Sequence, residues 1–286
     1  MPYQRKRSTS FAKTRGKTSI IVMMVFILGS LWGEVVALAV AAPPGDMVAL
    51  PEGSYRPLFQ DGDGPTRVAA FYLDRYAVTN VQYLAFVTTN PRFRRSSLPR
   101  LFADASYLRH WQDGLHPAQE EAKVIERPVT YVSWFAARAY CQWQQKRLPS
   151  TAEWEYAAQA SADHPDGRQD PSYFSRILAW YARPNPPRPA PMGSGGQNYW
   201  GVYDLHGVVW EWVADFHTAL VTGASRGDID FERNLFCGAG TAGVTEAERV
   251  NYPAFMRYAY RSSLQGAYTL PNLGFRCAKD AEGTAP

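Results

Sequence analysis

Residues 199–215, with the sequence YWGVYDLHGVVWEWVAD, constrain the fold more than any other segment. Large aromatic side chains are concentrated here and must be buried, while Gly201 and Gly207 mark turns between them. The whole chain has the same character, because nine Trp and seventeen Tyr are combined with 22 Gly and 21 Pro in 286 residues. We therefore expect a substantial core of short elements, which long ordered loops join and aromatic side chains hold together.

The N-terminus predicts export across a membrane. Six basic side chains and no acidic one occur in the first nineteen residues, and residues 20–32 are almost wholly apolar. Ala37, Ala39 and Ala41 then supply the small-residue pattern that a signal peptidase requires. We expect residues 1–41 to be a signal peptide, cleaved after Ala39 or Ala41 on the general secretory route.

Residues 42–286 are then expected to form one domain outside the cytoplasm, in the periplasm. The alternative is an uncleaved signal that holds the chain at the membrane, since a longer apolar run would approach the thickness of a bilayer. Residues 1–41 carry six positive charges and one negative, so their removal changes the net charge from +4 to about −1. A chain without a basic stripe is not expected to bind nucleic acid.

Periodicity and capping residues predict both strands and helices. Strands are expected over residues 47–55 and 68–74, and a turn that enters a final strand over residues 272–277. Capping patterns predict helices over Asn80–Thr88, from Ser133 through Trp143, and from Ser150 to about Ala160. Residues 91–127 and 163–197 are rich in turn residues, so we expect a long surface loop and a mobile loop there.

Three cysteines allow one intrachain disulfide and leave one thiol. Cys141 is expected on the buried face of a helix and Cys277 in the final strand; a bond between them would contribute roughly 4–5 kcal/mol of stability. Cys237 lies in a glycine-flanked loop, where the backbone can approach a ligand closely, so it is the candidate reactive thiol. The alternatives for Cys237 are a buried inert side chain and a bond to another chain.

Several common kinds of site have no support in the sequence. The scattered histidines have no zinc-site spacing, and neither a Gly-x-Ser-x-Gly turn nor a nucleotide-binding loop occurs. The Glu211 carboxylate follows a glycine turn and could join backbone carbonyls around Ca²⁺, which prefers oxygen ligands. A salt bridge or a buried hydrogen bond is the alternative for Glu211.

A series of motifs resembles the sulfatase-modifying-factor family, whose best-known member is the formylglycine-generating enzyme. The motifs are PVTYVSW at 128–134, AYCQW at 139–143, KRLPSTAEWEYAA at 146–158, YDLHGVVWEW at 203–212 and NLGFRC at 272–277. Matches at residues 47–54 and 75–80 extend the resemblance over most of the expected domain. The resemblance implies an α+β domain with a variant C-type-lectin-like fold and little regular secondary structure.

The resemblance also implies candidate site residues. Formylglycine-generating enzymes hold Cu(I) between two thiolates spaced Cys-x4-Cys, a choice of soft ligands that suits this ion. Cys237 matches the first thiol, but Ala242 stands where the second is needed, and Asn234 replaces a serine three residues before the first. Cys141 and Cys277 match the family's structural disulfide.

Two further chemistries of the family fit the sequence less well. Iron-dependent members need a histidine cluster, which this chain lacks. The calcium site that the resemblance implies would use Glu211 with the carbonyls of Gly207 and Val209, but Val208 stands where many members have Asn.

The resemblance extends to one branch of the family. Residues 225–228 and 254–264, with the Cys237 loop, look most like the branch associated with copper nitrite reductase in denitrifying bacteria. We expect an accessory or maturation factor for a polypeptide or metalloprotein partner outside the cytoplasm. Cys237 would be its redox or copper-binding thiol, with Arg261 near it to stabilise the thiolate. The alternatives are a catalytically inactive lectin-like binding module and a true formylglycine-generating oxidase that acts on a sulfatase cysteine.

Overall fold

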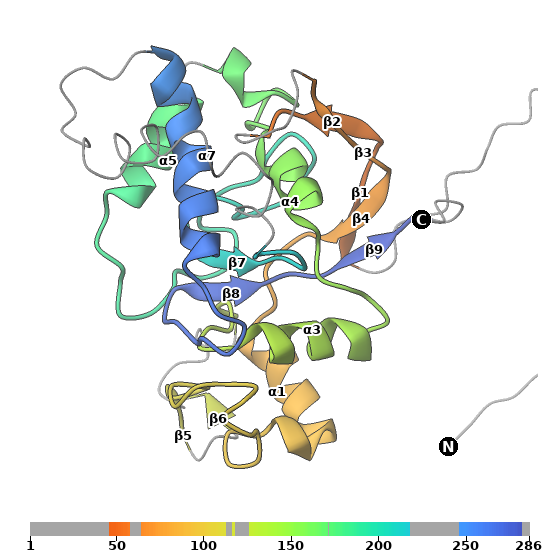
Figure 1. Cartoon of the computed structure of the whole chain (residues 1–286), viewed down its shortest axis with the longest axis vertical. Coiled ribbons are helices and arrows are strands. Elements are labelled where there is room, and N and C mark those ends of the chain that lie inside the picture. The colour runs from red at the N-terminus through yellow and green to blue at the C-terminus, as the bar shows by residue number, and fades with distance from the viewer. Residues whose placement is uncertain are drawn as a thin grey trace, which may run out of the picture. The chain divides into compact units, whose positions relative to one another are not determined.

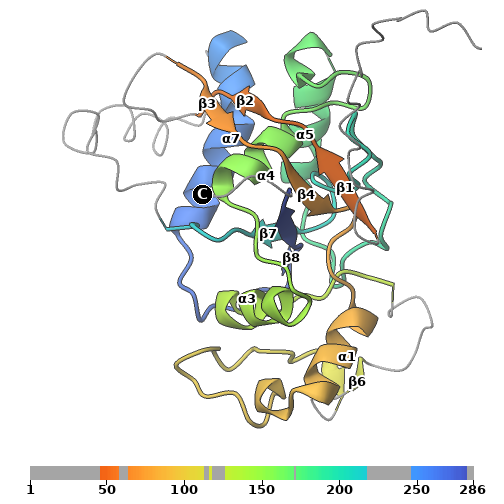
Figure 2. The same ribbon diagram turned by 90° about the vertical axis from the view of Figure 1, so that its right-hand side faces the viewer.

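The elements of the fold are short, as the sequence predicts, and the computed structural model describes them in residues 46–57, 64–112, 116–117, 126–170, 172–217 and 246–281 (Figures 1 and 2). The helices are α1 (Asn80–Thr89), η1 (Pro91–Phe93), α3 (Trp134–Trp143), α4 (Thr151–Ala158), η2 (Gly167–Gln169), α5 (Tyr173–Tyr181) and α7 (Glu246–Ser262). The strands are β1 (Met47–Leu50), β2 (Gly53–Tyr55), β3 (Thr66–Val68), β4 (Phe71–Asp74), β5 (Trp111–Gln112), β6 (His116–Pro117), β7 (Trp210–Trp212), β8 (Leu273–Phe275) and β9 (Ala278–Asp280).

Strands β1, β4 and β9 form an antiparallel sheet with β4 in the centre. Its register pairs Met47 with Asp74 and Leu73 with Ala278, so the C-terminal strand closes onto the N-terminal ones. The two long strands that the sequence predicts are each divided in the structure. The first is divided at Pro51 into β1 and β2, and the second is divided after Val68 into β3 and β4. Proline has no N–H group for a sheet ladder, which accounts for the first break. The separated pieces, β2 and β3, pair with each other as a second sheet.

Three of the helices begin where the capping residues predict. In α1 and α4 the N-cap side chains of Thr79 and Ser150 accept from the backbone three residues later, and Gln82 and Glu153 complete the two capping boxes. In α3 the Ser133 side chain accepts from the third residue of the helix. The three predicted helix starts are confirmed. They were predictable because each capping side chain satisfies backbone donors of its own helix and does not depend on the rest of the fold.

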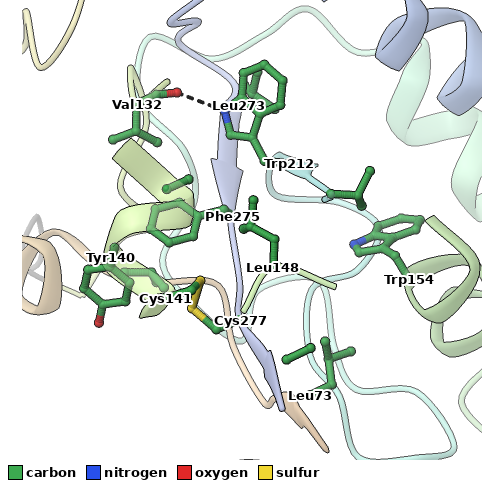
Figure 3. Close-up of a cluster of buried hydrophobic side chains, with 14 of the residues drawn as sticks. Leu73, Val132, Tyr140, Cys141, Leu148, Trp154, Trp212, Leu273, Phe275 and Cys277 are labelled. Carbon is green, nitrogen blue, oxygen red and sulfur yellow. Dashed lines mark hydrogen bonds between the residues drawn. A yellow bond between two sulfur atoms is a disulfide. The ribbon is translucent and has the colours of Figure 1, made fainter. Parts of the chain in front are cut away.

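A parallel pair of strands, β7 and β8, runs through the centre of the core. Trp212 of β7 is fully buried and donates from its ring nitrogen to the Val132 carbonyl at 2.9 Å (Figure 3). Cys141 of α3 and Cys277, which follows β8, form a disulfide in the same cluster (Figure 3). The structure therefore contains the predicted cysteine pair, and it ties the C-terminal strands to the first buried helix.

The aromatic segment at residues 199–215 enters the core only in part. Leu205 and Trp212 are buried, as expected, but Tyr199 is 51% exposed. Within the described residues, no helix is both long and apolar enough to cross a membrane.

Two of the α-helices, and both short 3₁₀ helices, were not predicted from the sequence. Helix α5 lies inside residues 163–197, which we expected to be a loop, and its buried residues are Tyr173 and Ile177, spaced one turn apart. Proline, glycine and aspartate on both sides of this short helix conceal its pattern. Helix α7 contains Pro253 and begins with polar residues, so its periodicity is weak.

Candidate functional site

Helices α5 and α7 pack against each other beside α4 and position the candidate site (Figure 1). Arg257 and Arg261 are four residues apart on α7 and so lie on one face of the helix. Both side chains are buried, and both reach Glu155 on α4. Helices α4 and α7, which are distant in sequence, thus meet at one charged cluster, and Arg257 also donates to the Tyr181 hydroxyl of α5 at 3.3 Å.

Glu155 accepts hydrogen bonds from two guanidinium groups. Arg257 donates from Nε to Oε1 at 2.9 Å and to Oε2 at 3.1 Å, and from Nη2 to Oε2 at 2.6 Å. Arg261 donates from Nη1 to Oε1 at 2.7 Å. Among the described residues, Glu155 is the one carboxylate within ion-pair distance of these two arginines, so the cluster carries an excess positive charge.

The electrostatics of the cluster follow from this arrangement. Burial alone would raise the pKa of Glu155, but the two guanidinium charges and their hydrogen bonds outweigh it and hold the pKa at about 2. Burial, assisted by the charge of Arg257, lowers the pKa of His206 to about 3. Near neutral pH the carboxylate is therefore ionised and His206 is neutral.

Aromatic rings surround the cluster. The guanidinium carbon of Arg261 lies 4.7 Å from the ring centroid of Trp154, within the range of a cation–π contact. The Trp210 ring stacks with Tyr181 at 5.1 Å and with Tyr260 at 4.5 Å between centroids. These rings exclude water from part of the cluster, which strengthens its electrostatic interactions.

A second buried ion pair lies next to the first. Arg276 donates to Glu211 from Nε and from Nη2, both at 2.8 Å, and the two side chains are fully buried. Trp154 also donates to Glu211 from its ring nitrogen at 2.8 Å. Both oxygens of Glu211 are therefore used within the protein, and the salt bridge weighed above against a calcium ligand is the arrangement in the structure.

Two cavities adjoin these groups and share Trp180 and Leu205 as lining residues. The smaller, of about 10 Å³, is lined by both arginines of the cluster and has room for about one water molecule. The larger, of about 700 Å³, lies between α5 and the loops around residues 160–164 and 194–207.

The structure brings several of the predicted site residues together. Arg261, Glu211 and Val209 all line the smaller cavity, while Gly207 lines the larger one. Gly207 has a φ of 117°, in a region that strongly favours glycine. Cys237 and Asn234 lie outside the described residues, so the proximity of Arg261 to Cys237 stays a prediction.

Sequence reasoning missed Glu155 and Arg257. The spacing of Arg257 and Arg261 by four residues was a usable signal, but only for a reader who had recognised α7 as a helix. Glu155 lies within the WEY motif and is 102 residues from its first partner, Arg257. No local pattern indicates such a pairing.

The arrangement favours a negatively charged group. Arg261 lines the smaller cavity and donates one hydrogen bond among the described residues, to Glu155. Its other N–H groups are therefore available to stabilise a negative charge next to the cluster. A thiolate, a carboxylate or a sulfate has the appropriate charge.

The α+β domain of short elements, the order of its motifs and the disulfide from α3 to the C-terminal strands are those of a fold of the formylglycine-generating-enzyme type. A family model for the sulfatase-modifying factor enzyme 1-like domain matches residues 34–281. The chain belongs to this family, which confirms the resemblance seen in the sequence and the predicted fold class.

Relatives within the family differ in activity. The inactive C-alpha-formylglycine-generating enzyme 2 of Bos taurus is 29% identical over 280 residues, which cover 82% of this chain and 88% of that protein. The formylglycine-generating enzyme of Streptomyces coelicolor is 31% identical over 270 residues, which cover 79% and 84%. The solved structure of PvdO from Pseudomonas aeruginosa has 19% identity and a TM-score of 0.43, with 82% and 94% covered. Family membership alone therefore does not decide whether this chain is an enzyme.

Proposed function

We propose that this chain is an exported accessory or maturation factor that acts on a polypeptide or metalloprotein partner outside the cytoplasm. Cys237 is its functional thiol, used in redox chemistry or in binding copper, and Arg261 stabilises the thiolate. The resemblance of residues 254–264 to the branch associated with nitrite reductase favours a copper or denitrification enzyme as the partner.

The disulfide is the observation that carries this proposal. Because Cys141 and Cys277 are bonded to each other, Cys237 is the only one of the three cysteines outside that bond. A factor with one free thiol can exchange with a partner's disulfide, which releases one partner thiolate, or can bind a partner's metal, without first opening its own structural bond.

The donor set does not fit a copper centre with two thiolates from one chain. Two cysteines are occupied in the disulfide, and Ala242 stands at the position of the second ligand. We therefore derive no step through such a centre, and any copper bound at Cys237 would need ligands from the partner. Calcium has no role in the proposal, since Glu211 is engaged by Arg276 and Trp154.

The proposal is tested on the folded, oxidised protein and on the variant Cys237→Ser. We expect iodoacetamide at neutral pH to modify Cys237 alone, and one Cu(I) to bind per wild-type chain when a thiol-containing partner peptide is present. The variant should show neither reaction. An unmodified Cys237 together with no bound Cu(I) would rule the proposal out.

A catalytically inactive binding module is the second candidate. Ala242 favours it, because the second thiol is absent. A relative at 29% identity that is named an inactive enzyme also favours it. Under this alternative the Cys237→Ser variant would bind its partner as tightly as the wild type does.

True formylglycine synthesis is tested separately, with a Cys-x-Pro-x-Arg peptide as substrate. We expect no conversion, because the second thiol is absent. Turnover of this peptide would show that one thiol is enough.

A further inference from the structure

Residues 91–111 form a strongly basic surface far from the Glu155 cluster in the sequence. This segment contains five arginines, no lysine and one acidic residue, Asp104. It follows α1, at the end of the domain opposite to β2 and β3 (Figures 1 and 2). We call it the arginine surface, which consists of Arg92, Arg94, Arg95, Arg100 and Arg109, with Arg188, whose charge acts on His110 as that of Arg95 does.

The charges of the arginine surface are not neutralised within the described part of the chain. None of its six guanidinium groups lies within 4.0 Å of a described carboxylate, whereas Arg147, Arg168 and Arg257 elsewhere are all paired. Arg92 and Arg109 instead lie over the rings of Phe93 and Tyr131, at 5.0 and 5.6 Å from the centroids. Such stacking leaves the edges of both guanidinium groups able to donate to a ligand.

The loop that carries this surface is held firmly. The Asp104 carboxylate accepts from the backbone of Ser106 at 2.8 Å and from the backbone and hydroxyl of Thr269. The Asp104 backbone N–H donates to the Ala267 carbonyl at 2.8 Å. A preorganised surface loses little conformational entropy on binding.

Two apolar side chains project beside the arginines. Leu101 is 76% exposed and Phe102 is 40% exposed. They follow the exposed Arg100 and precede the buried Ala103. Phe102 meets the edge of Phe135 with centroids 5.4 Å apart, which fixes its ring. Aromatic and arginine side chains around an apolar anchor are the composition that protein interfaces favour.

Two residues of the segment have a buried polar atom without a hydrogen-bond partner in the described part of the chain. Arg94 Nε and His110 Nδ1 are buried and have no hydrogen-bond partner among the described residues. Burial, together with the charges of Arg188 and Arg95, lowers the pKa of His110 to about 4, so these two arginines act on one point. A ligand acceptor that reached Arg94 Nε would satisfy a buried donor that otherwise costs free energy.

We propose that the arginine surface binds an acidic segment of a partner polypeptide, with Leu101 and Phe102 receiving an apolar side chain of that segment. Carboxylates suit the forked guanidinium group, and the absence of lysine indicates recognition of planar groups rather than attraction by charge alone. A membrane would require a wider apolar face, and single-stranded nucleic acid would require free ring faces for stacking. The inference names the chemistry of a partner and holds whether or not Cys237 is a functional thiol.

The test measures binding of a labelled glutamate-rich peptide that contains one leucine, by fluorescence anisotropy at low salt. We expect the wild-type protein and Cys237→Ser to bind it equally, and the double variant Arg95→Glu/Arg100→Glu to bind at least about tenfold more weakly. Arg56→Glu is the matched control, since Arg56 is also exposed but follows β2, and it should retain wild-type affinity. Both altered arginines are exposed, and an unchanged melting temperature verifies the fold of the double variant.

Three results would overturn the inference. The first is equal affinity of the wild type and the double variant for the peptide. The second is equal affinity for a peptide with glutamine in place of glutamate. The third is tighter binding to phosphatidylglycerol vesicles or to single-stranded DNA than to the acidic peptide. The unchanged affinity of Cys237→Ser separates this inference from the proposed function, because a failure of one leaves the other standing.

Discussion

The two buried ion pairs differ in their charge balance. Arg276 and Glu211 form a one-to-one pair that is fully buried, and Trp154 completes the hydrogen bonds of the carboxylate. Glu155 instead accepts from Arg257 and Arg261 together, beside a small cavity. The first pair is neutral, whereas the second leaves a positive charge beside a cavity that has room for about one water molecule.

This difference separates a structural pair from a candidate functional one. A neutral buried pair with satisfied hydrogen bonds joins distant parts of the chain, here β7 and the loop after β8. An excess buried charge is costly unless an anion balances it, so its presence indicates a site for one. Arg261 is the residue that makes the difference, because without it both clusters would be neutral.

The largest effect is expected for Glu155→Gln, which leaves two buried guanidinium groups without a carboxylate. Loss of one partner from a buried ion pair typically costs 3–5 kcal/mol, and we expect a loss of about 5 kcal/mol in the free energy of unfolding. Urea denaturation measures it, with Arg67→Gln as the control because its pair with Glu52 is exposed. A loss below about 1 kcal/mol would show that the cluster is not the buried charge centre described above.

The neutral pair provides the second test. Arg276→Met leaves Glu211 with Trp154 as its one remaining donor of those described, and we expect a loss of about 3–4 kcal/mol. The double variant Arg276→Met/Glu211→Leu should recover part of this loss, since it removes the unpaired charge. If the losses of stability from the two substitutions simply added, so that the double variant were less stable than Arg276→Met, the two side chains would not be energetically coupled.

The sequence predicted the parts of the fold that depend on local chemistry. The caps at Thr79, Ser133 and Ser150 are visible because each contacts its own helix, and the pairing of Cys141 with Cys277 was suggested by burial and by the family. The Glu155 cluster could not be found in this way, because its partners come from a helix more than a hundred residues later. Helix α7 contains Pro253, so the sequence did not indicate a helix there, and the four-residue spacing of Arg257 and Arg261 went unrecognised.

Acid unfolding tests the difference between the clusters through Arg261→Met. The pKa of Glu155 is about 2 in the folded protein and near 4.5 when unfolded, so its stabilisation is present above pH 4.5 and is lost as the pH falls through 2. The variant keeps the neutral pair with Arg257, and we expect it to be about 1–2 kcal/mol less stable at neutral pH. Loss of the Arg261 charge raises the pKa of Glu155 in the folded variant. The pH range between the folded and unfolded pKa values of Glu155, over which acid destabilises the protein, is then narrower.

The stability difference between wild type and Arg261→Met should therefore shrink between pH 4.5 and 2. His206, with a pKa of about 3, also destabilises the folded state on acidification, and because the charge of Arg261 helps to lower that pKa, the variant should lose less stability there as well. Urea midpoints measured at a series of pH values give the comparison. A difference that stays constant down to pH 2 would mean that Arg261 does not act on the Glu155 carboxylate.

The smallest effect is expected for Tyr260→Phe. The Tyr260 hydroxyl is buried with no hydrogen-bond partner among the described residues, and its ring stacks on Trp210. Removal of the hydroxyl keeps the stacking and relieves an unsatisfied group, so stability should be unchanged or higher by up to about 1 kcal/mol. Thermal unfolding suffices as the measurement, and a clear loss would reveal a hydrogen bond to a part of the chain outside the described residues.

The pKa of the Cys237 thiol tests most directly the claim that the excess charge of the Glu155 cluster serves the functional thiol. It is measured from the rate of iodoacetamide alkylation as a function of pH, in the wild type and in Arg261→Met. We expect a midpoint below the ordinary thiol value of about 8.5 in the wild type and a higher midpoint in the variant. The same midpoint in both proteins would contradict that claim.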